Sequence, residues 1–211
     1  MSRLPGDRPG VRRDDGNERT QAADAATGVV VRPEPYDGPI ARSLVAALIV
    51  DIDERYAGDD EPDDPEAEWA LEIADVTPPR GVFLVAHLDG RPVGCGALRP
   101  LPAAGARAAE IKRVYTSPSA RRRGVSRAVL ARLESEAAGF GYRRLQLQTG
   151  LRQPEAMALY ETSGYRRIPN FGRWAESDLT ACFAKDLPRA PTRRSGGRPR
   201  QRAAGGQGRA R

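Results

Sequence analysis

The sequence predicts an α/β (α+β) fold, with a central mixed, mostly antiparallel sheet of six to seven strands flanked by about four helices. Short runs of alternating and β-branched residues recur along the middle of the chain, as expected of strands. Two of these runs are joined by Asp89-Gly90, a dipeptide typical of a tight hairpin turn. Amphipathic stretches with apolar residues three and four positions apart alternate with the later strands, which predicts helices packed on the sheet.

The predicted elements follow in chain order. A strand at 29–32 and a helix at 38–56 with a proline in its first turn precede a second short helix at 66–76. A hairpin and a third strand come next, at 81–88, 91–99 and 109–116. The remaining elements are a helix with a buried face from Val125 to Phe140, a strand at 143–149, a helix at 154–163, and strands at 165–168 and 179–186.

Both ends of the chain are predicted to lie outside the folded domain. Residues 1–27 are polar and lack apolar periodicity, which predicts a disordered leader. Residues 188–211 hold eight arginines and no acidic residue, which predicts a basic disordered tail. Taking this +8 from the net charge of +6 leaves −2 for the remainder, so the domain expected over residues 28–187 is slightly acidic.

Composition excludes several classes of protein. Two cysteines, Cys95 and Cys182, are too few for a disulfide framework, and Cys95 is expected to be a small buried thiol in a strand. His87 is the only histidine, which argues against a zinc site or a histidine-based triad, so no metal is expected. No apolar run reaches membrane-spanning length and no secretory signal is visible, which predicts a soluble cytoplasmic protein.

A basic turn with one glycine precedes the long amphipathic helix. Arg121, Arg122, Arg123 and Arg127 cluster around Gly124 at the predicted helix start. A helix start carries partial positive charge and unpaired N–H groups, so cations there are unfavourable unless an anion is bound. The turn is therefore a candidate phosphate cradle, and a solvated basic helix start is the alternative.

An acidic segment from Asp51 to Glu68 contains ten acidic residues and one arginine. A solvated, partly disordered loop is the simplest interpretation of such a charge run. The alternative is a loop that overhangs a site for a cationic substrate and attracts it electrostatically.

Two sequence blocks and the order of elements resemble the GNAT superfamily of N-acetyltransferases over about Val29 to Leu187. In EIKRVYTSPSARRRGVSRAVLARLE, Arg121, Gly124 and Ser126 fall on the family signature Q/R-x-x-G-x-G/A, with Ser where Gly or Ala is usual. In LQLQTGLRQPEAMALYETSGYRRI, AMALYETSGY is similar to the family segment A-x-x-L-Y-x-x-x-G-F/Y.

The resemblance implies acetyl-coenzyme A as co-substrate. Backbone N–H groups of Arg122, Arg123, Gly124, Val125, Ser126 and Arg127 would hold its pyrophosphate. The pantetheine arm would pair with the strand end Val114, Tyr115 and Thr116. Gln153 occupies a position where many members have a cofactor-contacting Asn.

The resemblance also implies the catalytic residues. Tyr160 would give a proton to the departing thiolate, with a surface helix tyrosine as the alternative. Glu110 would act as general base through water, or would form a structural ion pair with Lys112, Arg113 or Arg99. Phe171 and Trp174 are candidate walls of the acceptor pocket or else core residues, and Tyr36 and Tyr56 are weaker candidates.

The predicted function is acetyl transfer from acetyl-coenzyme A to a primary amine of a small cationic molecule, through a tetrahedral intermediate. A protein or peptide N-acetyltransferase, or a non-catalytic acyl-coenzyme A-binding module, are the alternatives. The tail sequence GGRPRQR faintly resembles an AT-hook, so nucleic acid is a predicted partner only through the tail. No membrane partner is expected. Edge strands in this fold often pair between subunits, so a homodimer is one possible assembly, and the sequence does not fix the oligomeric state.

Overall fold

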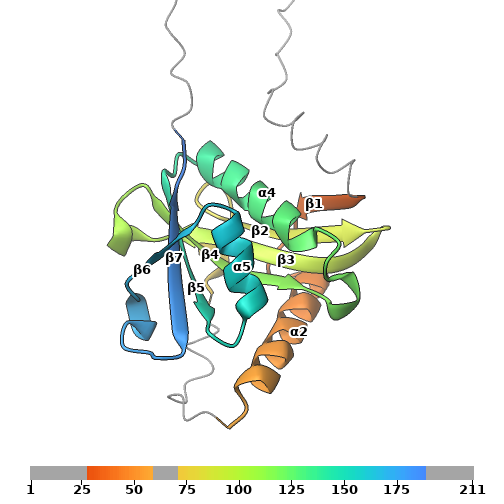
Figure 1. The fold of residues 1–211 in the computed structure, drawn as a ribbon. Helices are drawn as coiled ribbons and strands as arrows, with labels where there is room; N and C mark the ends of the chain where they lie inside the picture. The colour runs from red at the N-terminus through yellow and green to blue at the C-terminus, as the bar shows by residue number, and fades with distance from the viewer. Residues whose placement is uncertain (1–27, 59–70, 189–211) are drawn as a thin grey trace, which may run out of the picture.

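A seven-stranded sheet in the order β1-β2-β3-β4-β5-β7-β6 lies at the centre of the protein (Figure 1). The computed structural model describes residues 28–58 and 71–188. The strands are β1 (Val29–Pro33), β2 (Val82–Leu88), β3 (Arg91–Pro100), β4 (Ala108–Thr116), β5 (Arg144–Gly150), β6 (Arg166–Ile168) and β7 (Thr180–Asp186). Only β4 and β5 pair in parallel, so the sheet is mixed and mostly antiparallel, as predicted.

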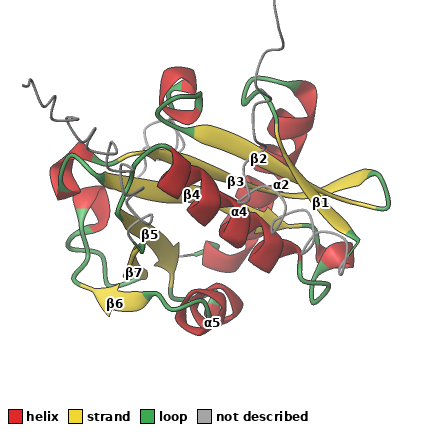
Figure 2. Ribbon diagram, turned by 90° about the horizontal axis from the view of Figure 1, so that it is seen from above, coloured by secondary structure: helices red, strands yellow, loops and turns green. Residues whose placement is uncertain are grey.

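Helices cover both faces of this sheet (Figures 1 and 2). The helices α4 (Val125–Gly139) and α5 (Pro154–Thr162) belong to one core cluster, which includes Leu133 of α4 and Tyr160 of α5. The helix α2 (Pro39–Tyr56) packs on the other face in a second cluster. We call these two sides the α4–α5 face and the α2 face.

The two faces follow from strand alternation. Along β4, Ala109 and Ile111 belong to the α4–α5 cluster, and the intervening Glu110 therefore points to the α2 face. Along β5, Leu145 and Leu147 likewise face α4 and α5, which leaves Gln146 and Gln148 on the α2 face.

The parallel pair β4–β5 is short. Its register runs from Ala108 opposite Arg144 to Ile111 opposite Leu147 and ends there. Beyond this point β4 continues to Thr116 paired with β3, while β5 continues to Gly150 paired with β7. The two strands therefore part in mid-sheet, and β4 presents an edge from residue 112 to residue 116.

A β-bulge lies on β4 where the strands part. Between the pairs Cys95–Tyr115 and Ala97–Lys112, β4 has one residue more than β3. Arg113 adopts a φ of 59°, and its carbonyl accepts a bond of 3.3 Å from Cys95 Sγ. Because a bulge re-aims the residues beside it, it marks this part of β4 as a special point of the sheet.

Most predicted elements are present with ends shifted by one or two residues. The predicted second helix is an exception, because residues 66–70 lie outside the described part and residues 73–76 form only a 3₁₀ turn (Ile73–Val76). The described residues accordingly contain three α-helices. None of the helices in residues 28–58 and 71–188 has the length and apolar character needed to cross a bilayer.

Candidate active site

The predicted phosphate cradle is a turn that precedes α4. The helix begins at Val125, so Arg121 to Arg123 lie in the turn before it and not inside the helix. The chain turns because Arg122 and Gly124 both have positive φ, 62° and 82°, and glycine adopts such a conformation without strain. The first helical bond runs from Ala128 N–H to Gly124 C=O, 3.0 Å, so the N–H groups of residues 125–127 precede the helix ladder.

The serine that departs from the family signature has a partner in the structure. The Ser126 and Thr116 hydroxyl oxygens lie 2.8 Å apart and share a hydrogen bond. This bond joins the end of β4 to the first turn of α4, and it directs the Ser126 side chain toward the strand. The added hydroxyl is thus accommodated without projecting from the turn.

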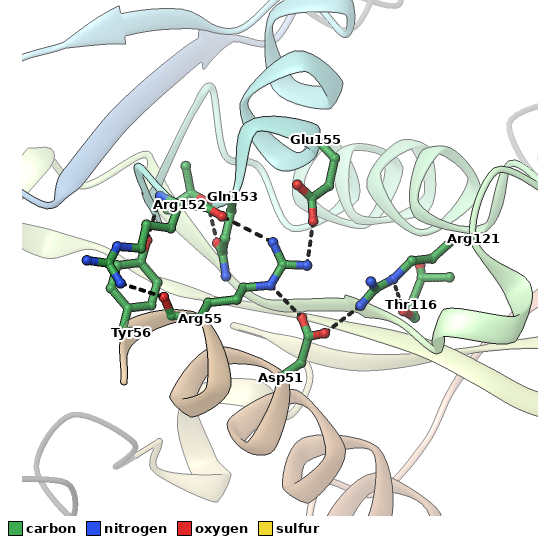
Figure 3. A network of polar contacts seen from close by, with 9 residues as sticks. Asp51, Arg55, Tyr56, Thr116, Arg121, Arg152, Gln153 and Glu155 are labelled. Carbon is green, nitrogen blue, oxygen red and sulfur yellow. Dashed lines mark hydrogen bonds and ion pairs between the residues drawn. The ribbon is translucent and has the colours of Figure 1, made fainter. Parts of the chain in front are cut away.

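Arg121 is held from the α2 face, which the sequence did not predict. Its guanidinium donates to Asp51 Oδ1 at 2.6 Å and to the Thr116 carbonyl at 3.3 Å (Figure 3). Its positive charge is therefore already paired, whereas Arg122 and Arg123 are exposed. Arg123 makes a looser ion pair, 3.6 Å, with the exposed Asp89.

A polar network at the end of α2 connects the two strands that part. Asp51 also accepts from Arg55 at 3.1 Å, and Arg55 pairs with Glu155 of α5 at 2.6 Å (Figure 3). The pKa of Arg55 is raised, chiefly by its bond to Glu155. Through Arg121 the same network reaches the end of β4, so α2 bridges the elements that follow β4 and β5. Only the i, i+4 spacing of Asp51 and Arg55 was visible in the sequence.

Tyr56 completes this bridge. Its hydroxyl accepts from the Arg152 N–H at 2.9 Å, and the Arg152 guanidinium lies 5.5 Å from its ring centroid. The ring lies so close to Gly150 that a Cβ at that position would overlap its hydroxyl. Tyr36, the other weaker candidate, packs on Phe83 with ring centroids 5.3 Å apart and belongs to the core on the α2 face.

Tyr160 is buried in the core of the α4–α5 face. It is 5% exposed, and its ring centroid lies 5.9 Å from that of Tyr165 and 6.0 Å from that of Phe183. The alternative of a surface helix tyrosine is therefore wrong. Burial raises the pKa of Tyr160, so its phenol is protonated at neutral pH.

Glu110 is buried, 2% exposed, and its carboxylate contacts two cations. Oε2 accepts two bonds of 2.7 Å from Arg99, and Oε1 lies 3.6 Å from Lys112 Nζ. Both carboxylate oxygens therefore already have cationic partners. Of the two roles that the sequence allowed for Glu110, these contacts favour the structural ion pair over the general base.

The loop after β6 borders the α2 face of β5. Gln148 donates from Nε2 to the Phe171 carbonyl at 2.5 Å, which ties this loop to the strand. Phe171 and Trp174 are half-buried and lie outside both core clusters, so the core interpretation is not supported. The Arg173 guanidinium lies 4.9 Å from the Trp174 ring centroid.

Gln153 precedes the first residue of α5. Its Oε1 accepts a bond of 2.7 Å from the Thr149 hydroxyl, and its carbonyl accepts from the Met157 N–H at 3.2 Å. The side chain therefore fastens the end of β5 to the start of α5. Within the residues that the structure describes, no three His, Cys, Asp or Glu side chains group as a metal site.

Comparison with known proteins assigns the chain to a protein family. A family model described as the acetyltransferase (GNAT) family matches residues 46–165. An IAA acetyltransferase from Azospirillum brasilense is 35% identical over 146 residues, which are 69% of this chain and 92% of that protein. The chain belongs to the GNAT acetyltransferase family.

Solved structures agree with this assignment at the level of the fold. A proposed acyl-CoA N-acyltransferase from Klebsiella pneumoniae subsp. pneumoniae has a TM-score of 0.61 at 25% identity, and the match covers 76% of this chain and 99% of that one. A GNAT family acetyltransferase from Elizabethkingia anophelis, solved with acetyl-CoA bound, has a TM-score of 0.52 at 18% identity over 76% and 99% of the two chains.

Proposed function

We propose that the protein transfers an acetyl group from acetyl-coenzyme A to a primary amine of a small molecule. One observation carries the proposal: the edge of β4 beyond Ile111 leads, through the 3₁₀ turn Pro118–Ala120, to a turn with N–H groups outside the helix ladder. An edge strand binds an extended amide-containing arm, and such a turn binds a diphosphate. Pantetheine and pyrophosphate have this order in coenzyme A, and the E. anophelis neighbour holds acetyl-CoA.

Each part of the cofactor then has its partners. The N–H groups of residues 122–127 bind the pyrophosphate, with Arg122, Arg123 and Arg127 adding charge. Residues 114–116 pair with the pantetheine arm, which brings the thioester to the point where β4 and β5 part. Gln153 and Ser126 act by fixing the ends of β5 and β4, since their side chains already bond Thr149 and Thr116.

The reaction proceeds by direct attack. The neutral amine nitrogen bonds to the thioester carbon, and the tetrahedral intermediate loses its C–S bond as the C=O bond re-forms. The new amide nitrogen releases a proton to solvent. The departing thiolate takes a proton from the Tyr160 hydroxyl, which is then restored from solvent. The cofactor turn and Tyr160 belong to the α4–α5 face, so the amine enters from the α2 face, with Phe171 and Trp174 beside it.

The charge of the acceptor was predicted from the acidic segment 51–68. Asp51 is committed to Arg55 and Arg121, and residues 59–68 lie outside the described part of the chain. An amine attracted as its ammonium ion and deprotonated at the site is compatible with this prediction. We also place the reaction in the cytoplasm, as predicted from the sequence.

Tyr160→Phe tests the mechanism, with Tyr165→Phe as the matched control in the same aromatic cluster. Thiol release from acetyl-coenzyme A is measured against a library of primary amines. We expect kcat to fall about a hundredfold in Tyr160→Phe, because general-acid catalysis contributes on that order. The KM for acetyl-coenzyme A should be unchanged, and Tyr165→Phe should keep its kcat.

Equal rates in the two variants would remove the proton-donor role from Tyr160. A non-catalytic acyl-coenzyme A-binding protein would behave differently, because coenzyme A would raise the unfolding temperature while no amine in the library released thiol. That combination would contradict the proposed transfer and leave cofactor binding in place.

A further inference from the structure

Three charged side chains form a cluster where β4 and β5 part. Arg99 of β3 and Lys112 of β4 both contact the buried carboxylate of Glu110. We call these residues the Arg99–Glu110–Lys112 cluster. It holds two positive charges and one negative charge, so one positive charge is left uncompensated within it.

The cluster lies on the face from which the amine enters. Glu110 points to the α2 face, and the register places Arg99 opposite Glu110 and Ala97 opposite Lys112. Lys112 is the first residue of β4 beyond the segment paired with β5. Across the gap, Gln148 is the first such residue of β5, and it borders the loop that carries Phe171. The surplus charge is thus next to the proposed acceptor pocket.

Both cations are reachable from solvent. The side chain of Arg99 is 30% exposed and that of Lys112 is 20% exposed, whereas Glu110 is 2% exposed. Burial lowers the pKa of Lys112; Glu110 opposes this shift, and Arg99 and Arg113 add to it. The ammonium group is therefore incompletely compensated, and a further anion beside it would stabilise its charged form.

We propose that Arg99 and Lys112 bind a carboxylate of the acceptor, which makes the acceptor an amino-acid-like molecule with an amine and a carboxylate. A monoanion matches the single surplus charge, and guanidinium and ammonium donors form charge-assisted hydrogen bonds with carboxylates. The buried Glu110 carboxylate holds both cations in place through its contacts with them. Binding the carboxylate here directs the amine toward the thioester between the strands. The inference rests on the proposed function, because it assumes that the α2 face receives the acceptor.

Matched pairs of acceptors test the inference. Amino acids and their carboxamides differ in one negative charge, and rates are compared at equal concentrations of neutral amine. We expect the wild-type protein to prefer the carboxylate of each productive pair. Lys112→Gln should raise the KM for that acceptor at least about tenfold, the value of one charge-assisted bond, and leave the carboxamide unchanged. The KM for acetyl-coenzyme A should not move.

Two variants sharpen the test. Lys112→Arg keeps the charge and should retain the preference for the carboxylate. Arg144→Gln removes a cation from the other end of β5, where it pairs with the exposed Asp186, and should leave the preference intact. Equal use of carboxylates and carboxamides by the wild type, or an equal KM change for both in Lys112→Gln, would overturn the inference.

A binding measurement separates this inference from the proposed function. The same pairs are added to the coenzyme A-bound protein, and the unfolding temperature is recorded. If the amino acid raises the unfolding temperature and its carboxamide does not, and Lys112→Gln abolishes this difference, the carboxylate site is supported. This holds even if no thiol is released, an outcome that would contradict only the transfer reaction. Thiol release without any carboxylate preference contradicts the site and leaves the transfer standing.

Discussion

Glu110 shows how the partners of one side chain decide its chemistry. The family resemblance implied a general base at this position, with an ion pair to Lys112, Arg113 or Arg99 as the alternative. The contacts with Arg99 and Lys112 in the folded sheet support the ion pair. Arg121 is a similar case. It was predicted as a phosphate ligand, and its partner Asp51 lies 70 residues away in the chain. Local patterns identify the residue type that a site needs, whereas long-range pairs fix what that residue can do.

The variant Glu110→Gln distinguishes a structural from a catalytic carboxylate. We expect the free energy of unfolding to fall by roughly 1–3 kcal/mol, because two partly exposed cations lose their common partner and repel each other. The acidic limb of the pH dependence of kcat/KM should stay where it is. Urea unfolding and pH–rate profiles measure the two effects. A variant of native stability whose acidic limb has disappeared would instead assign the base to Glu110.

Among the elements, β3 and α4 pack more closely than their sequences indicate. The segment GCGA was predicted as a strand with a buried thiol, and Cys95 is indeed 0% exposed. The flanking glycines serve the helix, since a Cβ on Gly96 would lie 2.6 Å from Val129 and 2.9 Å from Leu133. The apolar face of α4 was readable from its periodicity. Its contact with a glycine of β3 was not, because no local pattern records which strand a helix covers.

Gly96→Ala therefore tests the packing of α4 on the sheet. We expect a loss of about 1–3 kcal/mol in the free energy of unfolding, since Val129 and Leu133 must move to admit a methyl group. Gly139→Ala is the matched control, because a Cβ there meets nothing within 4 Å and alanine favours the helix by up to about 1 kcal/mol. Chemical denaturation of both variants gives the comparison. Equal stabilities would mean that α4 sits farther from β3 than the structure places it.

For the molecule as a whole, strand alternation, the hairpin turn and the helix starts were sufficient to predict the mixed sheet. The family was predicted from two sequence blocks and the order of the elements. The divergence of β4 from β5 is visible only in the register, which locates it after Ile111. The bulge at Arg113 could not be predicted, since no glycine marks it. The same is true of the bridge from α2 to α5, because Arg55 and Glu155 lie far apart in the sequence.

Charge is distributed unevenly along the chain, and this has a consequence for polyanion binding. The predicted tail carries all eight arginines of residues 189–211, and the rest of the chain has a net charge of −2. The last strand ends before this segment, at Asp186, and the Leu187 N–H donates to the Arg143 carbonyl at 2.8 Å. Deleting residues 189–211 should therefore abolish retention on a DNA column at low salt and leave thiol release unchanged.

Single arginine changes in the tail decide between simple charge attraction and an AT-hook. If the tail acts only by its charge, Arg198→Gln within GGRPRQR and Arg209→Gln outside it should lower the eluting salt concentration equally, because each removes one phosphate contact of the same kind. A hook that inserts into the minor groove would make Arg198→Gln much the more damaging, and A·T-rich DNA would then elute later than G·C-rich DNA. We expect equal shifts, because a single short Arg-Pro-Arg core among eight dispersed arginines favours non-specific phosphate contacts over insertion into the minor groove.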